Sequence, residues 1–574
     1  MKLVLKYMKP MRLFVIFTLT VKVIATVIEL FIPYVLSYIL DDMVPAGNIT
    51  NVVIWGGIML MFAVLACVTN IIANRMVSRI SRRVTEKTRH ELFERILHLS
   101  SRQVDEFTIP SLESRLTSDT YNVHHFVGIS MRMGIRAPIM ILGGIVVTAT
   151  LDPAMMLIMV LTMPLIAVAV GLITRRGIPL FKKSQRSVDS MVRIVREDSQ
   201  GIRVIKALSK VDYERRRFDK ANKQLVADEN QAGINMAASN PIVTVLLNFG
   251  LAVVIIVGAY RVIGGLSETG KIIAFIQYFT MISNAMIGIT RVFVNYSKGS
   301  ASAQRIAEVI NTKPDLCTES EDKYPRVSTS AHISFENVSF SYLGKKNDIS
   351  NVSFELLHGQ TLGIIGATGS GKTTLGQLLM RFYDVDSGSV RIDGRDVRTI
   401  PHEELNTRFG VVQQNDFIYA GTIRDNIDFG RGLDDADIER AARIAQAEEY
   451  ILDYDDKYDH LLNSKGTNLS GGQRQRLLIS RALAGSPEIL ILDDSSSALD
   501  YKTDAKLRKA IKDEMGDITT IVVAQRVSSV MNSDIIIVLD DGMIIGMGKH
   551  DELIENCPVY KEISDSQIGG AVID

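Results

Sequence analysis

The chain has 574 residues, too many for one hydrophobic core, so its length predicts several domains or a large helical bundle joined to another domain. Hydrophobic residues make up 47% of it, yet charged residues reach 22%, so an apolar and a polar region must coexist. The 64 Lys and Arg residues balance the 64 Asp and Glu residues, so no net charge draws the whole chain to nucleic acid. The three cysteines lie far apart, without a Cys-x-x-Cys or Cys/His cluster, and predict neither a disulfide framework nor a structural zinc site.

Six apolar stretches are long enough to cross a bilayer, which takes about 20 residues. They lie near 13–40, 52–74, 129–150, 153–174, 241–263 and 272–294. The basic N-terminus precedes an apolar run longer than a signal-peptide core, so we expect a retained first helix. The long loops are rich in Lys and Arg while the short loops carry just Lys271, so the positive-inside rule places the long loops and both termini in the cytosol, with the chain in the cell membrane.

The long loops keep a helical apolar period, so the membrane helices are expected to continue into the cytosol. Lys313-Pro314 is expected to end the last of them. Beyond Ala331, short β-rich runs alternate with helical patterns, which is typical of an α/β domain with a mostly parallel sheet. The predicted domains are an α-helical, six-crossing transmembrane domain over 1–313, a linker over 314–330 and an α/β P-loop domain over 331–574.

The run Gly366-Ala-Thr-Gly-Ser-Gly-Lys372-Thr373 fits the phosphate-loop pattern G-x-x-x-x-G-K-[ST] and stands between a strand and a helix. Backbone N–H groups would close around the β-phosphate, Lys372 would reach the β- and γ-phosphates, and the Thr373 hydroxyl would bind Mg²⁺. ATP and Mg²⁺ are therefore the expected cofactors. The candidate binding residues are Gly366, Thr368, Gly369, Ser370, Gly371, Lys372, Thr373 and Thr374.

Two further motifs follow. An apolar strand over 489–492 ends in Asp493 and Asp494, which suits delivery of a carboxylate to the Mg²⁺ beside the phosphate loop. The run Leu469-Ser470-Gly471-Gly472-Gln473 precedes an amphipathic helix, whose free N–H groups and dipole would form a second anion site.

With these motifs in this order, the chain resembles an ATP-binding-cassette (ABC) exporter half-transporter over its whole length. Leu469–Gln473 is similar to the signature of that family. The resemblance implies that residues 331–574 form an ATP-binding cassette, that Tyr342 stacks on adenine, and that Gln414 senses the Mg²⁺ held by Thr373 and Asp493. It also implies that two cassettes face each other head to tail, so that Ser470, Gly471, Gly472 and Gln473 complete the site of a partner.

Three other stretches are also similar to segments of that family. Ser496–Asp500 resembles a loop that communicates between the two nucleotide sites. Ser114–Asp119 and Gly201–Ala207 resemble the intracellular loops whose short coupling helices press on the ATPase domains.

Two positions depart from the family, and both belong to the hydrolytic machinery. The family has Glu after Asp493, where this chain has Asp494, and a switch His where it has Gln525. The catalytic candidates are therefore Asp494, Gln525 and Gln414, in a site expected to bind ATP and hydrolyse it slowly. The stretch Asn463-Ser-Lys-Gly466 also departs from the family's Gly-Glu-Arg-Gly. These departures predict the degenerate-site subunit of a heterodimeric, multidrug-type exporter; a homodimeric transporter of lipid or peptide, an exporter-like importer and an ATP-gated channel remain alternatives.

Polar residues in the crossings have two interpretations. Gln277, Asn284, Arg291 and Asn295 share one face of the sixth crossing, and Lys22 and Glu29 are seven apart on the first. They either line a central translocation cavity or hydrogen-bond neighbouring helices. Methionines would add adaptable apolar surface for varied amphipathic small molecules, although the sequence identifies no substrate. They are Met140, Met155, Met156, Met159, Met163, Met281 and Met286.

Overall fold

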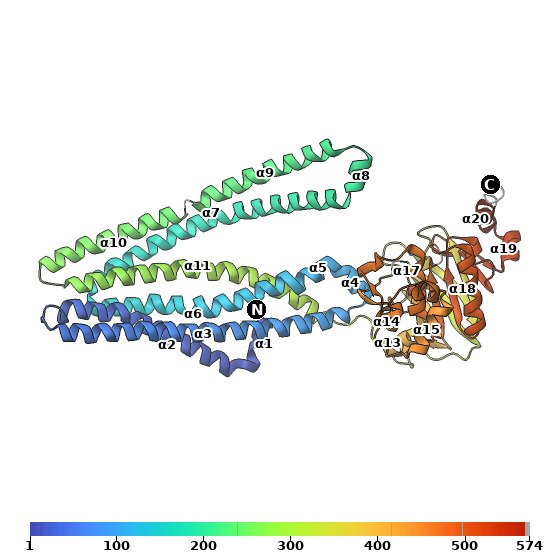
Figure 1. Cartoon of the computed structure of the whole chain (residues 1–574), viewed down its shortest axis with the longest axis horizontal. Coiled ribbons are helices and arrows are strands. Elements are labelled where there is room, and N and C mark those ends of the chain that lie inside the picture. The colour runs from blue at the N-terminus through green and yellow to red at the C-terminus, as the bar shows by residue number, and fades with distance from the viewer. Residues whose placement is uncertain (238, 415, 496–497, 569–574) are drawn as a thin grey trace. The chain divides into compact units, whose positions relative to one another are not determined.

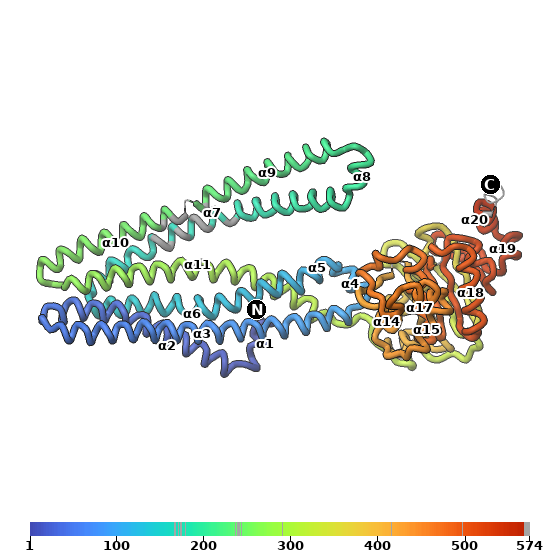
Figure 2. Tube along the Cα trace, viewed as in Figure 1, coloured from blue at the N-terminus to red at the C-terminus, as the bar shows by residue number. Residues whose placement is uncertain are grey.

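The structure of the protein is a computed structural model, which describes residues 1–237, 239–414, 416–495 and 498–568. It divides into two compact units. The first comprises Met1–Leu97 and Thr108–Thr312, and the second comprises His98–Phe107 and Lys313–Asp574. Figures 1 and 2 show that the first is built of long helices and that the second combines strands with shorter helices. A short segment from within the predicted membrane domain thus groups with the second unit.

Helices make up the first unit throughout its described residues. They are α1 (Lys2–Met8), η1 (Lys9–Met11), α2 (Arg12–Tyr38), η2 (Ile39–Met43), α3 (Ile49–Leu97), α5 (Ile109–Ser114), η3 (Arg115–Asp119), α6 (Thr120–Leu151), α7 (Pro153–Gln200), α8 (Ile202–Ala207), α9 (Val211–Ala237), α10 (Ser239–Ile263) and α11 (Thr269–Asn311). Local chemistry sets the boundaries, for example at α7, where Asp152 Oδ1 accepts from the N–H groups of Ala154 and Met155, with Pro153 at the first helical position.

Within the residues that the structure describes, five helical segments are long and apolar enough to cross a membrane. They are Lys2–Met43, Ile49–Leu97, Ile109–Leu151, Thr244–Ile263 and Thr269–Asn311. The remaining predicted crossing, 153–174, lies in α7, where Pro153–Leu165 is apolar and helical; the side chains of 166, 167, 170, 173 and 174 lie outside the described ones. Helices α3, α7 and α11 continue well past their apolar stretches, as the periodicity predicted. Helices α7 and α9 lie side by side and are joined by α8 (Figure 1).

Small residues let α6 and α11 approach closely. A Cβ atom added to Gly299 of α11 would lie 2.5 Å from Cβ of Phe126, and one added to Gly144 of α6 would lie 2.5 Å from Cδ1 of Ile282. Nearer the helix ends, the buried Asp119 carboxylate accepts from the Arg305 guanidinium and from the Ser302 hydroxyl at 2.8 Å. In a bilayer such close packing is a main source of helix association, because lipid is as apolar as the side chains.

The second unit contains two main sheets. The antiparallel sheet has the order β2-β1-β4-β5, and the six-stranded sheet has the order β12-β11-β3-β10-β9-β6, parallel except for its edge strand β12. Their bounds are β1 (Ala331–Phe340), β2 (Ile349–Leu357), β3 (Thr361–Gly366), β4 (Ser387–Ile392), β5 (Arg395–Asp396), β6 (Phe409–Val412), β9 (Ile489–Asp493), β10 (Thr519–Val523), β11 (Ile535–Asp540) and β12 (Met543–Gly548), and the short strands β7 (Gly421–Thr422) and β8 (Leu461–Leu462) pair separately.

Helices cover these sheets and connect their strands. They are α4 (Ser101–Phe107), α12 (Lys372–Leu379), α13 (His402–Thr407), α14 (Ile423–Asp428), α15 (Asp435–Ile444), α16 (Glu448–Leu452), α17 (Gly471–Leu483), α18 (Tyr501–Glu514), α19 (His550–Asn556) and α20 (Pro558–Ile568), with the 3₁₀ turns η4 (Val397–Thr399), η5 (Lys457–Asp459), η6 (Ser464–Gly466) and η7 (Val527–Ser529). Strands β9 and β10 are buried along their whole length, as expected of parallel strands covered on both faces. The predicted fold class, a helical transmembrane domain followed by an α/β domain, is confirmed.

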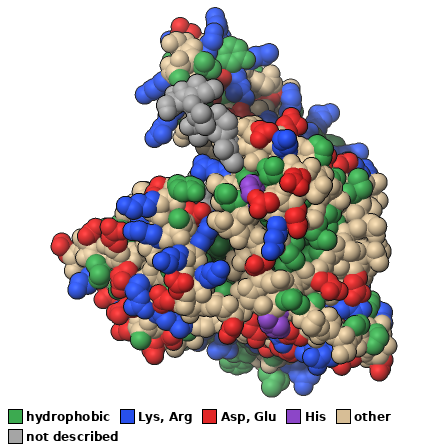
Figure 3. Space-filling model, turned by 90° about the vertical axis from the view of Figure 1, so that its right-hand side faces the viewer, with side chains coloured by type: hydrophobic (Ala, Val, Ile, Leu, Met, Phe, Trp, Pro, Cys, Tyr) green, Lys and Arg blue, Asp and Glu red, His purple; other side chains and the backbone are tan. Residues whose placement is uncertain are grey.

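The two units differ in the surface they present. Large exposed apolar side chains are frequent on the long helices, among them Leu13, Ile54, Leu142, Leu161 and Phe249. Figure 3, which views the molecule from the end carrying α18, α19 and α20, shows acidic and basic side chains intermingled over much of that face. This contrast matches the composition, in which a large apolar fraction coexists with many charges.

We expect Gly299→Ala to destabilise the first unit. The added methyl would meet Phe126 near its backbone, at Cβ and Cγ, where the ring cannot swing away. The matched control is Gly57→Ala in α3, where no atom lies within 4 Å of the added Cβ. Thermal unfolding of the solubilised protein should show a melting temperature lowered by several degrees for Gly299→Ala. An equal response of the two variants would contradict the close approach of α6 and α11.

Candidate functional site

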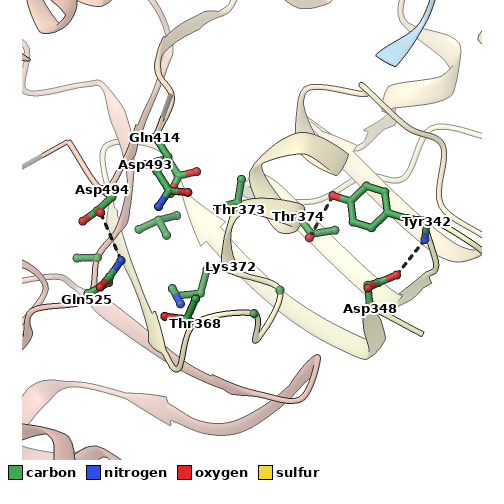
Figure 4. A pocket seen from close by; sticks show the side chains of 14 residues that line it. Tyr342, Asp348, Thr368, Lys372, Thr373, Thr374, Gln414, Asp493, Asp494 and Gln525 are labelled. Carbon is green, nitrogen blue, oxygen red and sulfur yellow. Dashed lines mark hydrogen bonds between the residues drawn. The ribbon is translucent and has the colours of Figure 1, made fainter. Parts of the chain in front are cut away.

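A cavity lies at the carboxyl edge of the six-stranded sheet, where β3, β9 and β10 end (Figure 4). In doubly wound α/β sheets, ligands bind outside this edge. The lining residues are Tyr342, Asp348, Thr368, Gly369, Gly371, Lys372, Thr373, Thr374, Gln414, Asp493, Asp494, Val523, Ala524 and Gln525. Eleven of the predicted site residues are thus brought together. Gly366, Ser370 and the four residues Ser470 to Gln473 are not in this lining.

The loop after β3 wraps tightly around the first turn of α12. Gly371 has φ +98°, and a Cβ there would lie 2.6 Å from Cδ1 of Ile349, so only glycine fits. Lys372 Nζ donates to the carbonyls of Gly366 and Ala367 at 2.9 and 2.7 Å, which folds the loop over the lysine. The loop therefore surrounds the N-terminus of α12, where free N–H groups and the helix dipole favour an anion.

Burial of polar groups at this loop fits a phosphate ligand. Burial lowers the pKa of Lys372, while the nearby carboxylates of Asp493 and Asp494 oppose that shift. The hydroxyl of Ser370 is buried and has no hydrogen-bond partner in the part of the chain that the structure describes. A phosphate in the cavity would supply the negative charge that Lys372 lacks, because its oxygens accept charge-assisted hydrogen bonds.

Asp493, at the end of β9, and Thr373, in the first turn of α12, form a candidate magnesium site. Asp493 is buried, which raises its pKa, while a hydrogen bond from Thr373 opposes the shift. A magnesium ion here would reverse that shift, because it favours the ionised carboxylate and accepts oxygen ligands from Asp493 and Thr373. The two side chains therefore fit the metal-binding role that the sequence predicts for them.

Asp494 lies next to Gln525. Gln525 Nε2 is 3.4 Å from Asp494 Oδ2, a contact at the limit of hydrogen bonding (Figure 4). Asp494 has a left-handed backbone with φ +51°, and its carbonyl oxygen is 3.4 Å from Nε2 of Gln475. Burial raises the pKa of Asp494, against the opposing charges of Arg526 and Lys372. The two positions that depart from the family pattern thus lie side by side in the cavity.

Tyr342 forms the far wall of the cavity. Its hydroxyl donates to Gln377 Oε1 at 2.6 Å, and its backbone N–H donates to Asp348 Oδ2 at 2.9 Å. The edge of its ring meets Tyr383, with ring centroids 5.1 Å apart. These contacts fix an aromatic face beside the phosphate loop. Asp348 is a lining residue that the sequence analysis missed, and no motif marks it.

The signature segment forms a capped helix start away from this cavity. Ser470 Oγ accepts from the Gln473 N–H at 3.2 Å, and Gln473 Oε1 accepts from the Ser470 N–H at 2.9 Å, which is a capping box at the start of α17. Ser470 and Gly471 are exposed. Of the predicted communication loop, Ser496 and Ser497 lie outside the described residues.

Helix α4 belongs to the second unit. Ser100 Oγ accepts from the Gln103 N–H at 3.2 Å and donates to Asp315 Oδ2 at 2.8 Å. Tyr383 donates its hydroxyl hydrogen to Asp105 Oδ2 at 2.7 Å. Sequence reasoning missed this helix, although Ser100-x-x-Gln103 is a recognisable capping-box pattern. The predicted loop Ser114–Asp119 instead lies in the first unit, where Asp119 is buried against Arg305.

Polar residues of the first unit differ in their contacts and exposure. Lys22 is buried and donates to Asn70 Oδ1 at 2.8 Å, and Glu29 pairs with Arg136 at 2.5 Å, so these two connect α2 with α3 and α6. Gln277, Asn284 and Arg291 are exposed on one face of α11. Of the seven methionines, Met140, Met155, Met159 and Met163 are buried, and Met156, Met281 and Met286 are half-buried.

Known proteins share both units. The model of the ABC transporter transmembrane region matches residues 15–286, and that of the ABC transporter ATPase matches residues 349–497. The chain is 35% identical over 573 residues to the uncharacterized ABC transporter ATP-binding protein YfiB of Bacillus subtilis, covering 99% of each chain. This chain belongs to the ABC transporter family. Its second unit is therefore an ABC ATPase domain, which couples ATP hydrolysis to transport by a multi-pass domain in the lipid bilayer.

Other similar proteins include an ABC transporter of known activity. The present chain is 33% identical to the uncharacterized ABC transporter ATP-binding protein Rv1273c of Mycobacterium tuberculosis, covering 99% and 98% of the two chains. It is 30% identical to the ATP-dependent lipid A-core flippase of Vibrio parahaemolyticus, covering 86% and 85%. It shares the fold of a bacterial Atm1-family ABC exporter solved with ATP bound, with a TM-score of 0.80 and 22% identity over 97% and 98% of the chains.

We expect Lys372→Ala to weaken nucleotide binding by about tenfold or more, because it removes the buried charge at the phosphate loop. Photolabelling of the purified chain with an azido-ATP analogue measures this. Lys509→Ala, which removes an exposed charge from α18, is the control and should label normally. Unchanged labelling of Lys372→Ala would mean that this cavity does not bind the nucleotide.

Proposed function

We propose that this chain is the catalytically impaired half of a heterodimeric ABC exporter that extrudes amphipathic compounds across the cell membrane, with both termini in the cytosol. The observation that carries the proposal is the neighbouring placement of Asp494 and Gln525 in the nucleotide cavity. A complete phosphate loop beside an altered hydrolytic pair supports a site that binds Mg-ATP and turns it over slowly.

The chemistry of the two side chains supports impaired hydrolysis. Asp494 keeps the charge of the usual Glu but is one methylene shorter, so its carboxylate stands back from a water poised at the γ-phosphate by about 1 Å, and a misplacement of that size costs about 10²-fold in rate. Gln525 donates through an amide that carries no titratable nitrogen, so it cannot supply the positive charge of a protonated His. Both losses act on the same transition state.

The signature supports a role in the site of a different partner. The Ser470 capping box holds the first turn of α17 in place, and the N–H groups of Gly471 and Gly472 have no acceptor within that helix. Aimed at a γ-phosphate, these N–H groups and the helix dipole would stabilise the charge of the transition state. A chain that keeps this signature but alters its own hydrolytic residues fits a partner with a complete Glu and His.

The tip of the α7 and α9 hairpin supports the presence of a second half-transporter. Helix α8 has no buried residue, and Ile202, Val204 and Leu208 there are exposed. Apolar side chains at a helix tip outside the apolar stretches favour a covering protein surface. In the proposed heterodimer that surface is the ATPase domain of the partner.

The polar face of α11 supports the proposed substrate class. Gln277, Asn284 and Arg291 are exposed at intervals of seven, while the opposite side of the helix, including Phe275, Tyr278 and Ile282, is buried. Such residues in a membrane helix normally face a bundle interior or an aqueous cavity. A partly polar path suits amphipathic compounds, and the similarity to a lipid A-core flippase points to the same class.

We expect the double variant Asp494→Glu with Gln525→His to raise the steady-state ATPase activity of the chain purified alone by about 10²-fold. A homodimer of this variant would have two complete sites, whereas the wild-type homodimer would have none. Adding Lys372→Ala to the double variant should return the rate to background. Brisk turnover by the wild-type chain alone, with no gain from the double variant, would favour a competent homodimer instead.

In the complex with its co-purified partner, Ser470→Arg should abolish ATP turnover, whereas Asp494→Asn should be much milder. The arginine places bulk in the phosphate cradle of the competent site and removes the capping hydroxyl. Asp494→Asn alters only the site that is already slow. The measurement is the steady-state ATPase rate of the two variant complexes under identical conditions. An equal loss of rate in both would show that the impaired and competent sites are wrongly assigned.

A further inference from the structure

Three metal-binding side chains meet at the end of the antiparallel sheet. His332 is the second residue of β1, His358 follows β2, and Asp393 lies in the two-residue turn between β4 and β5. The register brings them together, because Ala331 pairs with Leu357 and Ile333 pairs with Ile392. Each side chain offers one ligand atom, and these atoms all lie within 4.8 Å of one another.

His332 presents a ring nitrogen that lacks a partner. The residue is 1% exposed, and its Nε2 has no hydrogen-bond partner among the residues that the structure describes. Its other nitrogen, Nδ1, lies 2.7 Å from the Thr519 hydroxyl. Buried polar atoms are almost always satisfied, so an unpartnered one calls for an explanation. A hydrogen bond at the second ring nitrogen is what normally orients a metal-binding histidine.

His358 and Asp393 lie beside this nitrogen and are accessible. The imidazole rings of His332 and His358 are stacked with their centroids 3.8 Å apart, and His358 Nε2 is 3.0 Å from Asp393 Oδ1. Arg408 holds the other carboxylate oxygen of Asp393 at 3.0 Å and so keeps Oδ1 turned toward the histidines. The His358 side chain is 62% exposed, so its ring can tilt out of the stack without disturbing the core.

Burial determines the protonation state of the His332 ring. Burial lowers the pKa of His332 to about 4, and the neighbouring His358 contributes to the shift. A metal ion binds the neutral form of imidazole, through the ring nitrogen that carries no proton.

We propose that His332, His358 and Asp393 form a binding site for a divalent transition-metal ion, for which Zn²⁺ is the best match. Two imidazole nitrogens and one carboxylate oxygen suit zinc, whereas Mg²⁺ and Ca²⁺ prefer oxygen ligands alone. Ligand atoms around tetrahedral zinc lie roughly 3.4 Å apart, given bonds of about 2.1 Å. His358 Nε2 and Asp393 Oδ1 are already 3.0 Å apart, and no pair of ligand atoms needs to close by more than about 1.4 Å. A tilt of His358 supplies this movement, and water takes the fourth position.

This site is separate from the nucleotide cavity. His358 stands before the amino end of β3, whereas the phosphate loop begins at its carboxyl end, so the length of β3, roughly 20 Å, lies between them. Through Thr519, at the start of β10, the bound ion would connect the edge of the antiparallel sheet to the central strands of the parallel sheet. Its effect is then on the stability of the ATPase domain.

Zinc titration of the full-length, detergent-solubilised chain tests this site. The protein is stripped with a chelator and titrated without nucleotide, in competition with a chromogenic indicator and with excess Mg²⁺ to occupy oxygen-only sites. The wild type should bind one more tight Zn²⁺ than His358→Ala, and Asp393→Asn should weaken this site by tenfold or more. The matched control is His460→Ala, because His460 also pairs with a carboxylate, Asp456, at 2.8 Å. It should retain the site.

Two further measurements exclude a mere loss of fold. Zinc should raise the melting temperature of the wild type and of His460→Ala but not that of His358→Ala, whose change is on the surface. X-ray absorption of the zinc-loaded wild type should show two imidazole nitrogens at about 2.0–2.1 Å. The proposal is overturned if the wild type binds no zinc, or if His358→Ala binds it as tightly as the wild type does.

Discussion

The register of three parallel strands decides where the reactive groups of the ATPase domain lie. Val523 of β10 is level with Ile364 of β3 on one side and with Asp493 of β9 on the other. Because the strands end together, the phosphate loop, the two carboxylates and Gln525 open into one cavity. A slip of one residue in β9 would turn Asp493 to the opposite face of the sheet. The burial of β9 and β10 along their whole length holds that register in place.

The same arrangement keeps charged groups out of water before any nucleotide binds. Lys372 and Asp493 are both buried. Burial lowers the pKa of Lys372 and raises that of Asp493, so it disfavours the charged form of each. Lys372 is supported by two loop carbonyls, and Asp493 by Thr373. A phosphate and a magnesium ion would supply the missing opposite charges to these groups. Pairing with these ligands would compensate the desolvation of Lys372 and Asp493, which favours binding of Mg-ATP.

Local patterns made the phosphate loop and the fold class predictable, because the residues that act together there are close in sequence. Contacts made through sheet register could not be predicted in the same way. Asp348 and the His332, His358 and Asp393 cluster join residues that only strand pairing brings together. No Cys/His motif marks the cluster, because its ligands come from three separate turns and strand ends. Lys22 was ambiguous for a related reason, since its partner Asn70 lies on another helix.

Binding and hydrolysis depend on different residues of the cavity, and this separation is what an impaired half-transporter needs. The phosphate loop, Asp493 and Tyr342 line the cavity and require only that Mg-ATP be held. Asp494 and Gln525 lie beside each other at the end of the cavity away from Tyr342, where they would act on the attacking water and on the developing charge. The loop contacts of Lys372 are with the carbonyls of Gly366 and Ala367 and involve neither Asp494 nor Gln525. Slow hydrolysis can therefore arise without loss of binding, and ATP retained in such a site would keep two cassettes associated while the competent site turns over.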